Sequence, residues 1–214
     1  MPFHGLYFDG SSHTSPLATY LRRMTTHGKA LPRRVREGAV FTTPESFEHI
    51  RHINNSTPSD TTRDITKRVN ELSKKLIFTH AAILAGGNNP GRRPDEKTAD
   101  ELNDIADEAV KDLANICKKL YQHRHKSHNI KIKILLPPPR LTPGYHLYLS
   151  ALHQKLLDNT TTKRYYSDSN RFQKLYRRNF TAASASHFYP GDSTHLSKDT
   201  YKEFNAWIGE IVFE

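Results

Sequence analysis

The stretch that decides the fold is LIFTHAAILA (residues 76–85), followed by GGNNPG (86–91) and, a few residues later, by ADELNDIADEAVKDLANICKKLY (99–121). The first segment is a largely apolar run with the length of a buried strand, and the glycine and asparagine residues after it are typical of a turn. The third segment repeats apolar residues every three or four positions, which indicates one continuous buried stripe. The stretch therefore predicts a strand, a turn and a helix in succession.

The same alternation extends in both directions along the chain. Strands that alternate with helices indicate a mainly parallel sheet with helices on both faces, so we expect an α/β fold, a three-layer α/β/α sandwich. The other expected strands lie at 3–8, within 29–41, at 130–136 and near Tyr165. A first expected helix contains Leu17, Tyr20 and Leu21, and a second begins at Pro44 and contains Phe47 and Ile50. Further helices are expected at 59–75, at 145–157 and after Ser197.

Composition limits the class of protein. At 214 residues we expect one domain over 1–214, whether alone or as part of a longer protein. The 32 Lys and Arg residues against 22 Asp and Glu leave a net charge of +10, which is typical of proteins with an acidic partner such as nucleic acid. No run approaches the ~20 apolar residues of a membrane span and no secretory signal is apparent, so we expect an intracellular protein, cytoplasmic or nuclear. Cys117 lies on the apolar stripe of the helix at 99–121, which predicts a core residue.

The segment LYFDGSSHT (6–14) places two hydroxyls directly after an apolar strand. Ser11 and Ser12 follow Gly10, where a turn from strand to helix exposes a side chain and the first amides of the helix can help to bind an oxyanion. The segment therefore offers two candidate nucleophiles.

The segment PGDSTHLS (190–197) places Asp192 three positions before His195. On a loop, this spacing lets the carboxylate accept a hydrogen bond from Nδ1–H of the imidazole, which leaves Nε2 to take a serine proton. A capped helix start with exposed side chains would explain Asp192 and Ser197, but it would not explain His195 followed by Leu196.

Two more segments offer N–H donors after expected strands. EGAV (37–40) contains Gly38, whose backbone N–H is one donor, and GGNN (86–89) contains Asn88, whose side-chain amide is another. Taken alone, each segment is more simply explained as a turn.

In this order, the four segments resemble the sequence blocks of the SGNH hydrolases and span nearly the whole chain. LLPPPR (135–140) adds to the resemblance, because related enzymes often carry an apolar strand that ends in Leu-Pro-Pro or Leu-Pro-Arg. The resemblance is closest to the esterase-like domains in the first open reading frame of LINE-type retrotransposons, and looser to carbohydrate O-acetyl esterases. It implies an SGNH hydrolase (flavodoxin-like) architecture.

The resemblance also implies roles for five residues. Ser12 would be the nucleophile and His195, oriented by Asp192, the general base. Gly38 and Asn88 would donate to the oxyanion of the tetrahedral intermediate, together with the N–H of the nucleophile itself. The implied substrates are small acyl esters, acetyl esters above all, or an acetylated larger molecule, and this chemistry needs no metal or cofactor.

The chain departs from the family pattern at two positions. Ser11 and Asn89 stand where the family usually has aspartate. If the aspartate, glycine and serine that precede Ser12 are taken as a permuted motif, Ser11 becomes the nucleophile. We prefer Ser12, because His13 and Thr14 then keep the register of the family.

A second class of function follows from the polar segment 159–185, where cations alternate with aromatic rings. This pattern suits phosphate contacts and base stacking, but it equally suits rings that pack inward beneath solvated cations. The alternative function is a catalytically weak SGNH-like module that binds nucleic acid through a basic surface. The histidine-rich run 123–128 is more simply a solvated basic helix end than a metal site. The candidate nucleic-acid contacts are Arg164, Tyr165, Arg171, Lys174, Arg177 and Arg178.

Overall fold

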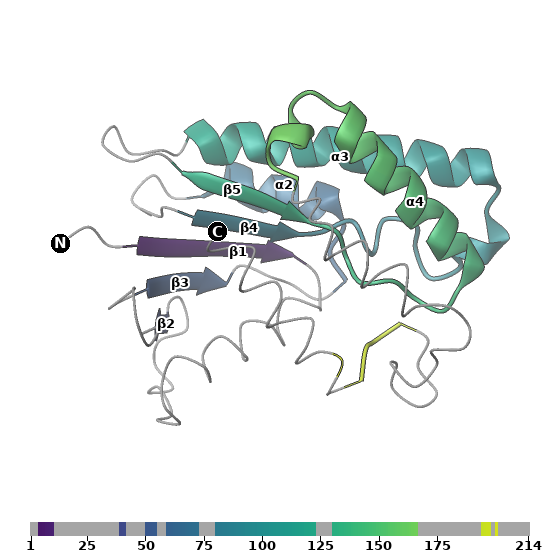
Figure 1. Ribbon diagram of the computed structural model, residues 1–214, viewed down its shortest axis with the longest axis horizontal. Helices are drawn as coiled ribbons and strands as arrows, with labels where there is room; N and C mark the ends of the chain where they lie inside the picture. The colour runs from purple at the N-terminus through teal and green to yellow at the C-terminus, as the bar shows by residue number, and fades with distance from the viewer. Residues whose placement is uncertain are drawn as a thin grey trace.

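The computed structural model describes residues 4–10, 39–41, 50–54, 59–72, 80–122, 130–166, 194–197 and 200. Within these residues, the strands of one sheet are β1 (His4–Gly10), β2 (Ala39–Phe41), β3 (Ile50–Asn54), β4 (His80–Leu84) and β5 (Lys131–Leu135). Their order is β2-β3-β1-β4-β5 (Figure 1). All neighbours run parallel except β2 and β3, which are antiparallel at one edge. The expected mainly parallel sheet is confirmed.

The helices of the described residues are α2 (Thr62–Asn70), the 3-10 turn η1 (Pro94–Glu96), α3 (Ala99–Gln122), α4 (Pro143–Asp158) and the 3-10 turn η2 (Thr162–Arg164). The connections from β3 through α2 to β4, and from β4 through α3 to β5, step across the sheet in the same direction. Right-handed crossovers of this kind place their helices on one face. In agreement, α3 packs against both α2 and α4, and Figure 1 shows α3 and α4 together.

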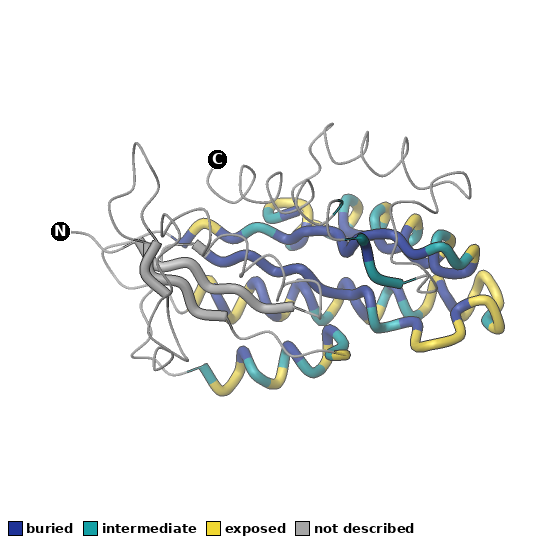
Figure 2. The backbone as a smooth tube through the Cα atoms, turned by 90° about the horizontal axis from the view of Figure 1, so that it is seen from below, coloured by how far each residue is buried: buried dark blue, intermediate teal, exposed yellow. Residues whose placement is uncertain are grey.

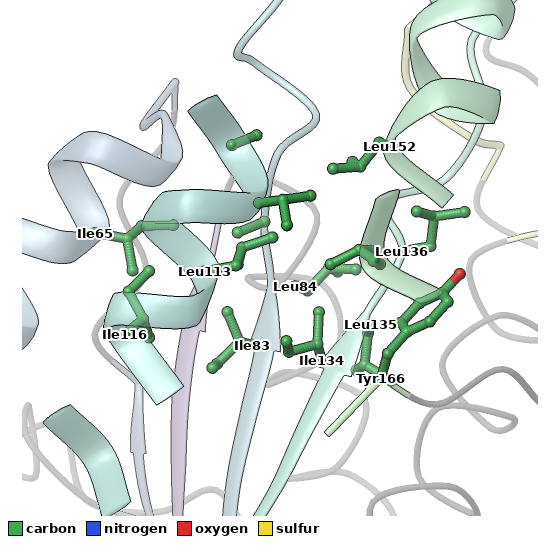
Figure 3. Close-up of a cluster of buried hydrophobic side chains, with 14 of the residues drawn as sticks. Ile65, Ile83, Leu84, Leu113, Ile116, Ile134, Leu135, Leu136, Leu152 and Tyr166 are labelled. Carbon is green, nitrogen blue, oxygen red and sulfur yellow. The ribbon is translucent and has the colours of Figure 1, made fainter. Parts of the chain in front are cut away.

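Strand β4 is buried on both faces of the sheet. The side chains of Ala81–Leu84 in β4 are at most 1% exposed, although successive side chains of a strand point to opposite faces. On one face, Ile83 lies with Ile65 of α2 and with Leu113 and Ile116 of α3 (Figure 3). Figure 2 shows the described part of β4 buried throughout, whereas in β5 an exposed and a half-buried lysine alternate with buried residues.

Helix α3 forms because its cap and its apolar stripe agree. The backbone N–H of Thr98 donates to Oε2 of Glu101 (2.7 Å), and the N–H of Glu101 donates back to Oγ1 of Thr98 (3.2 Å). This reciprocal pair satisfies two N–H groups that the first turn leaves without helical partners. The expected stripe and the expected core position of the cysteine are confirmed, since the buried residues of α3 are Leu102, Ala106, Ala109, Val110, Leu113, Ala114, Ile116, Cys117 and Leu120.

Helix α2 is shorter than the helix expected over 59–75. It begins after Thr61, whose backbone N–H (3.1 Å) and hydroxyl (2.7 Å) both donate to Oδ2 of Asp64, and it ends at Asn70. These hydrogen bonds hold the pKa of the Asp64 carboxyl below its ordinary value. The capping residue therefore sets the start of the helix three positions later than the apolar period suggests.

The expectation for Ile50 is wrong. It was expected on a helix that begins at Pro44, but it lies at the start of β3, where it pairs with His4 of β1 on one side and with Phe41 of β2 on the other. A short apolar segment adopts the structure that its neighbours complete, and here two strands supply backbone partners.

Two weaker expectations are confirmed in reduced form. The strand expected near Tyr165 is a single parallel bridge between Tyr166 and Ile134 of β5. Ser197 caps a helix as expected, because its Oγ accepts the N–H of Thr200 (3.3 Å). The expected helix after Ser12, and the rest of the helix that follows Ser197, lie outside the described residues.

Three parallel strands end at the same level of the sheet. In the register of the sheet, Gly10 of β1 pairs with Leu84 of β4, and Leu84 pairs with Leu135 of β5. The segments 85–91 and 136–142 therefore leave the sheet at neighbouring points, on the side to which the arrows of Figure 1 point. Active and ligand-binding groups of open α/β sheets lie at this carboxyl edge.

Candidate active site

The loop after β4 is a compact turn, as its glycine and asparagine content predicts. The N–H of Asn89 donates to the carbonyl of Gly86 (3.2 Å), and the N–H of Gly91 donates to the carbonyl of Asn88 (3.1 Å). Gly86 has φ of +101°, a backbone conformation that side chains with a Cβ rarely adopt. The turn projects Asn88 and Asn89, both half-buried, from the carboxyl edge of the sheet.

Two buried tyrosines of α4 hold this loop and the neighbouring segment after β5. Tyr148 donates from Oη to the carbonyl of Gly86 (2.8 Å), and Tyr145 donates from Oη to the carbonyl of Pro138 (3.3 Å). Burial raises the pKa of Tyr145 to about 12 and raises that of Tyr148 well above its ordinary value, so both phenols stay neutral donors. Helix α4 thereby sets the relative position of the two loops.

Arg140 links the two loops directly. It follows the three prolines after β5 and is only 8% exposed. Its Nη2 donates to Oδ1 of Asn88 (2.9 Å), and its guanidinium carbon lies 4.6 Å from the centre of the Tyr145 ring. The guanidinium therefore stacks on Tyr145 of α4 and at the same time donates a hydrogen bond to Asn88 in the loop after β4.

The carboxamide of Asn88 is held at both ends. Oδ1 accepts from Arg140, and Nδ2 donates to the backbone carbonyl of Asp60 (3.0 Å). A guanidinium only donates and a carbonyl only accepts, so these two partners fix which end of the amide is which. Among the described residues this is the one acceptor of Nδ2, and the amide nitrogen carries a second hydrogen.

The segment before α2 that accepts from Asn88 is itself anchored. The carboxylate of Asp60 pairs with the guanidinium of Arg68 of α2. Ser59 adopts φ of +70°, which is uncommon for a residue with a Cβ and turns the chain into the start of α2. The carbonyl of Asp60 is therefore a fixed acceptor.

Asn89, the residue that departs from the family pattern, serves a different purpose from Asn88. Its Oδ1 accepts the N–H of Thr62 (3.1 Å), and its Nδ2 donates to Oγ1 of Thr62 (2.8 Å). The Thr62 hydroxyl has one hydrogen, which it donates to Oδ2 of Asp112 in α3 (2.8 Å). Residue 89 must consequently donate to that hydroxyl, which an amide can do and an ionised carboxylate cannot.

Sequence reasoning missed the residues that orient the two asparagines. Asp60, Thr62 and Asp112 carry no motif, and the hydrogen bonds that join them to the loop or to one another span 27 to 50 residues. LLPPPR drew attention to Arg140 only as part of a resemblance, with no role attached. An arginine directly after an apolar strand and three prolines was the one local signal for it.

The other candidate catalytic residues stand as follows. His195 is half-buried and is followed by the fully buried Leu196, in a segment that Figure 1 shows beyond the arrowheads of the central strands. Ser12, Gly38 and Asp192, and the rival nucleophile Ser11, lie outside the described residues. The structure therefore shows hydrogen-bond partners of Asn88 that the sequence did not predict, namely Asp60 and Arg140. The catalytic roles of Ser12, Gly38, Asp192 and His195 stay predictions.

Of the candidate nucleic-acid contacts, two are described. Arg164 is exposed on η2, whereas Tyr165 is half-buried and packs against the core beside Cys117 and Tyr121. For Tyr165, the interpretation that the ring packs inward is therefore the better one. Outside the described residues lie Arg171, Lys174, Arg177 and Arg178.

The described residues contain neither a metal-binding cluster nor a membrane-spanning helix. No group of three or more His, Cys, Asp or Glu side chains there could hold a metal ion. In the same part of the chain, no helix combines the length and apolar character needed to cross a bilayer.

Neither models of known protein families nor the curated proteins give a match to the chain. Solved structures do. A lipase/acylhydrolase from Enterococcus faecalis aligns with a TM-score of 0.58 at 16% identity, over 98% of this chain and 95% of that one. Axe2, an acetylxylan esterase from Geobacillus stearothermophilus, aligns with 0.55 at 18%, over 99% and 95%. TesA aligns with 0.57 at 16%, over 96% and 97%.

These likenesses concern the fold. They confirm the three-layer α/β/α sandwich with a mainly parallel sheet, the SGNH hydrolase architecture expected from the sequence. The expected closeness to retrotransposon-encoded domains stays a prediction.

Proposed function

We propose that the chain is a serine esterase that hydrolyses small acyl esters, acetyl esters above all. The observation that carries the proposal is the carboxamide of Asn88. Arg140 and the Asp60 carbonyl hold it at the carboxyl edge of the sheet with its amide hydrogens in a fixed direction. Preorganised N–H donors of this kind stabilise the oxyanion of acyl transfer, because they need not reorient as charge develops.

In the proposed reaction, Ser12 attacks the ester carbonyl while His195, oriented by Asp192, removes its proton. The backbone N–H groups of Ser12 and Gly38 and the Nδ2–H of Asn88 receive the oxyanion. The alcohol leaves with the proton from the imidazolium, and water activated by the same imidazole then releases the acid.

Chain connectivity supports a nucleophile close to Asn88. Ser12 is two residues beyond Gly10, so its Cα can be no more than about 7 Å from that of Gly10. Gly10 pairs with Leu84, four residues before Asn88 in the turn after β4. The nucleophile and the amide donor therefore belong to adjacent strand ends.

The surroundings of His195 support a role as base. Leu196 is fully buried, and Ser197 accepts the N–H of Thr200, so the segment is anchored directly after the histidine. The imidazole itself is half-buried, which leaves room for it to meet a substrate. An anchored but partly accessible imidazole suits proton transfer.

The substrate class follows from the same resemblance and is supported by the neighbours in fold. Structures named as a lipase/acylhydrolase and as an acetylxylan esterase share the architecture of this chain. An acetyl ester carries the smallest common acyl group, which makes p-nitrophenyl acetate the first substrate to test.

The test compares two neighbouring serines. Parent protein should hydrolyse p-nitrophenyl acetate and form a covalent serine adduct with a fluorophosphonate, which peptide mapping should locate at Ser12. Ser12→Ala should abolish both signals, and the matched variant Ser11→Ala should retain them.

Full activity in Ser12→Ala with loss in Ser11→Ala would contradict the assignment of the nucleophile. An inactive parent that binds RNA in a salt-sensitive manner would contradict the esterase and support the nucleic-acid-binding module instead.

A further inference from the structure

We infer that Arg140 is a positioning residue of the oxyanion hole, which acts through Asn88. In this role, which rests on the proposed esterase function, the guanidinium orients the carboxamide and makes its Nδ2–H a stronger donor.

The first support is geometric. Arg140 contacts Asn88 through Oδ1 at 2.9 Å, at the opposite end of the amide from the proposed donor Nδ2. Its own position is set by α4, since the guanidinium stacks on the ring of Tyr145, which is fully buried. Arg140 thus fixes the oxygen end of the Asn88 amide relative to helix α4.

The second support is electrostatic. Arg140 is only 8% exposed, and the ion pairs of the described residues do not include it. Buried cations are ordinarily paired, because burial without a counter-charge is costly. A positive charge on the amide oxygen withdraws electron density from the nitrogen, and an oxyanion gains from this more than a neutral carbonyl does. The effect therefore grows in the transition state.

The third support is that stability alone explains Arg140 poorly. Within the described part of the chain, its Nε is buried without an acceptor. An unsatisfied buried N–H destabilises a fold, and an apolar side chain of similar length would avoid that cost. Residues that cost stability are characteristic of functional sites.

The experiment measures kcat and KM for p-nitrophenyl acetate, with thermal unfolding, in Arg140→Met, Arg140→Lys, Asn88→Ala and the double variant Arg140→Met/Asn88→Ala. Asn88→Ala should lower kcat by about 10²- to 10³-fold, as loss of one oxyanion donor does. Arg140→Met should lower kcat by about tenfold or more with KM within about twofold, because its effect belongs to the transition state.

Three results distinguish positioning from a structural role. Arg140→Lys, which keeps the charge, should recover part of the lost kcat. The midpoint of unfolding of Arg140→Met should not fall. In the Asn88→Ala background, Arg140→Met should cause no further loss, because it acts through the missing amide. Arg93→Met is the matched control, since the Arg93 side chain is 77% exposed and pairs with Glu96.

Unchanged kcat in Arg140→Met, or losses that multiply in the double variant, would overturn the inference while an active parent upheld the esterase. A fall in kcat accompanied by an equal loss of folded protein in both Arg140 variants would also overturn it. A parent that neither hydrolyses esters nor reacts with a fluorophosphonate would overturn the proposed function, and this role with it.

Discussion

Replacement of Asn89 by aspartate should destabilise the protein, although aspartate is the residue usual for this position in the SGNH pattern. In the parent, Thr62 donates its one hydroxyl hydrogen to Asp112 (2.8 Å) and accepts from Nδ2 of Asn89 (2.8 Å). Asn89→Asp keeps the acceptor for the Thr62 N–H but removes the donor. An oxygen lone pair of the new carboxylate would then face the hydroxyl oxygen.

The magnitude follows from three terms. Loss of one hydrogen bond costs about 1 kcal/mol. The carboxylates of residues 89 and 112 would lie about 5 Å apart, and their repulsion is roughly 1 kcal/mol in water and 3 kcal/mol at a partly screened site. Asp112 and residue 89 are both half-buried and still reached by water, so we take the lower figure as a minimum. A carboxylate that accepts from the first residue of α2 regains about 0.5 kcal/mol from the helix dipole. The free energy of unfolding should fall by at least about 1.5 kcal/mol, which lowers the unfolding midpoint by roughly 3–6 °C or more.

Urea and thermal unfolding of Asn89→Asp measure this loss, with Asn115→Asp on the exposed side of α3 as the matched control. The double variant Asn89→Asp/Asp112→Asn should regain most of it. In that variant the new amide donates to the Thr62 oxygen, and the hydroxyl donates to the new carboxylate. The reasoning is refuted if Asn89→Asp is as stable as the parent, or if the double variant is less stable than Asn89→Asp alone.

Three other outcomes follow from the same structure. Gly144→Ala should lower the free energy of unfolding, measured by urea denaturation, by about 2 kcal/mol, because a Cβ at this position would overlap the backbone carbonyl of Pro94. Unchanged stability would show that the start of α4 can shift without cost. Parent stability should fall by roughly 2–3 kcal/mol between about pH 10 and 12 on account of Tyr145, because the folded phenol, with a pKa of about 12, holds its proton more tightly than the unfolded one. Tyr145→Phe should flatten this alkaline decline relative to Tyr121→Phe, which alters a 40% exposed ring, and equal slopes would argue against it. His195→Asn should abolish ester hydrolysis because the proposed base is removed, and undiminished hydrolysis in this variant would count against a histidine base.

Local patterns predicted the elements whose signals lie within one segment. Helix α3 and strand β4 carry an apolar period or run long enough to determine their structure, and both were found close to their expected positions. Ile50 was assigned wrongly because five residues carry too little periodicity, and pairing with β1 and β2 decided the outcome.

In the candidate site, too, the sequence indicated a residue but not its contacts. Asn88 could be singled out from the sequence because it stands in a short block after a strand. Its orientation could not, because its partners Asp60 and Arg140 are 28 and 52 residues away and meet it only when the strand ends align. The need for an amide rather than a carboxylate at Asn89 was equally hidden, since it depends on the single hydroxyl hydrogen of Thr62.

By itself, then, the sequence determined the elements with long apolar signals, such as β4 and α3, and the residue types at the strand ends, because both are recorded in short-range spacing. Only the tertiary structure decided which side chains hold one another across the carboxyl edge of the sheet. Hydrogen bonds depend on distance and direction in space, and the packing of α4 against two loops sets both for Arg140 and Asn88.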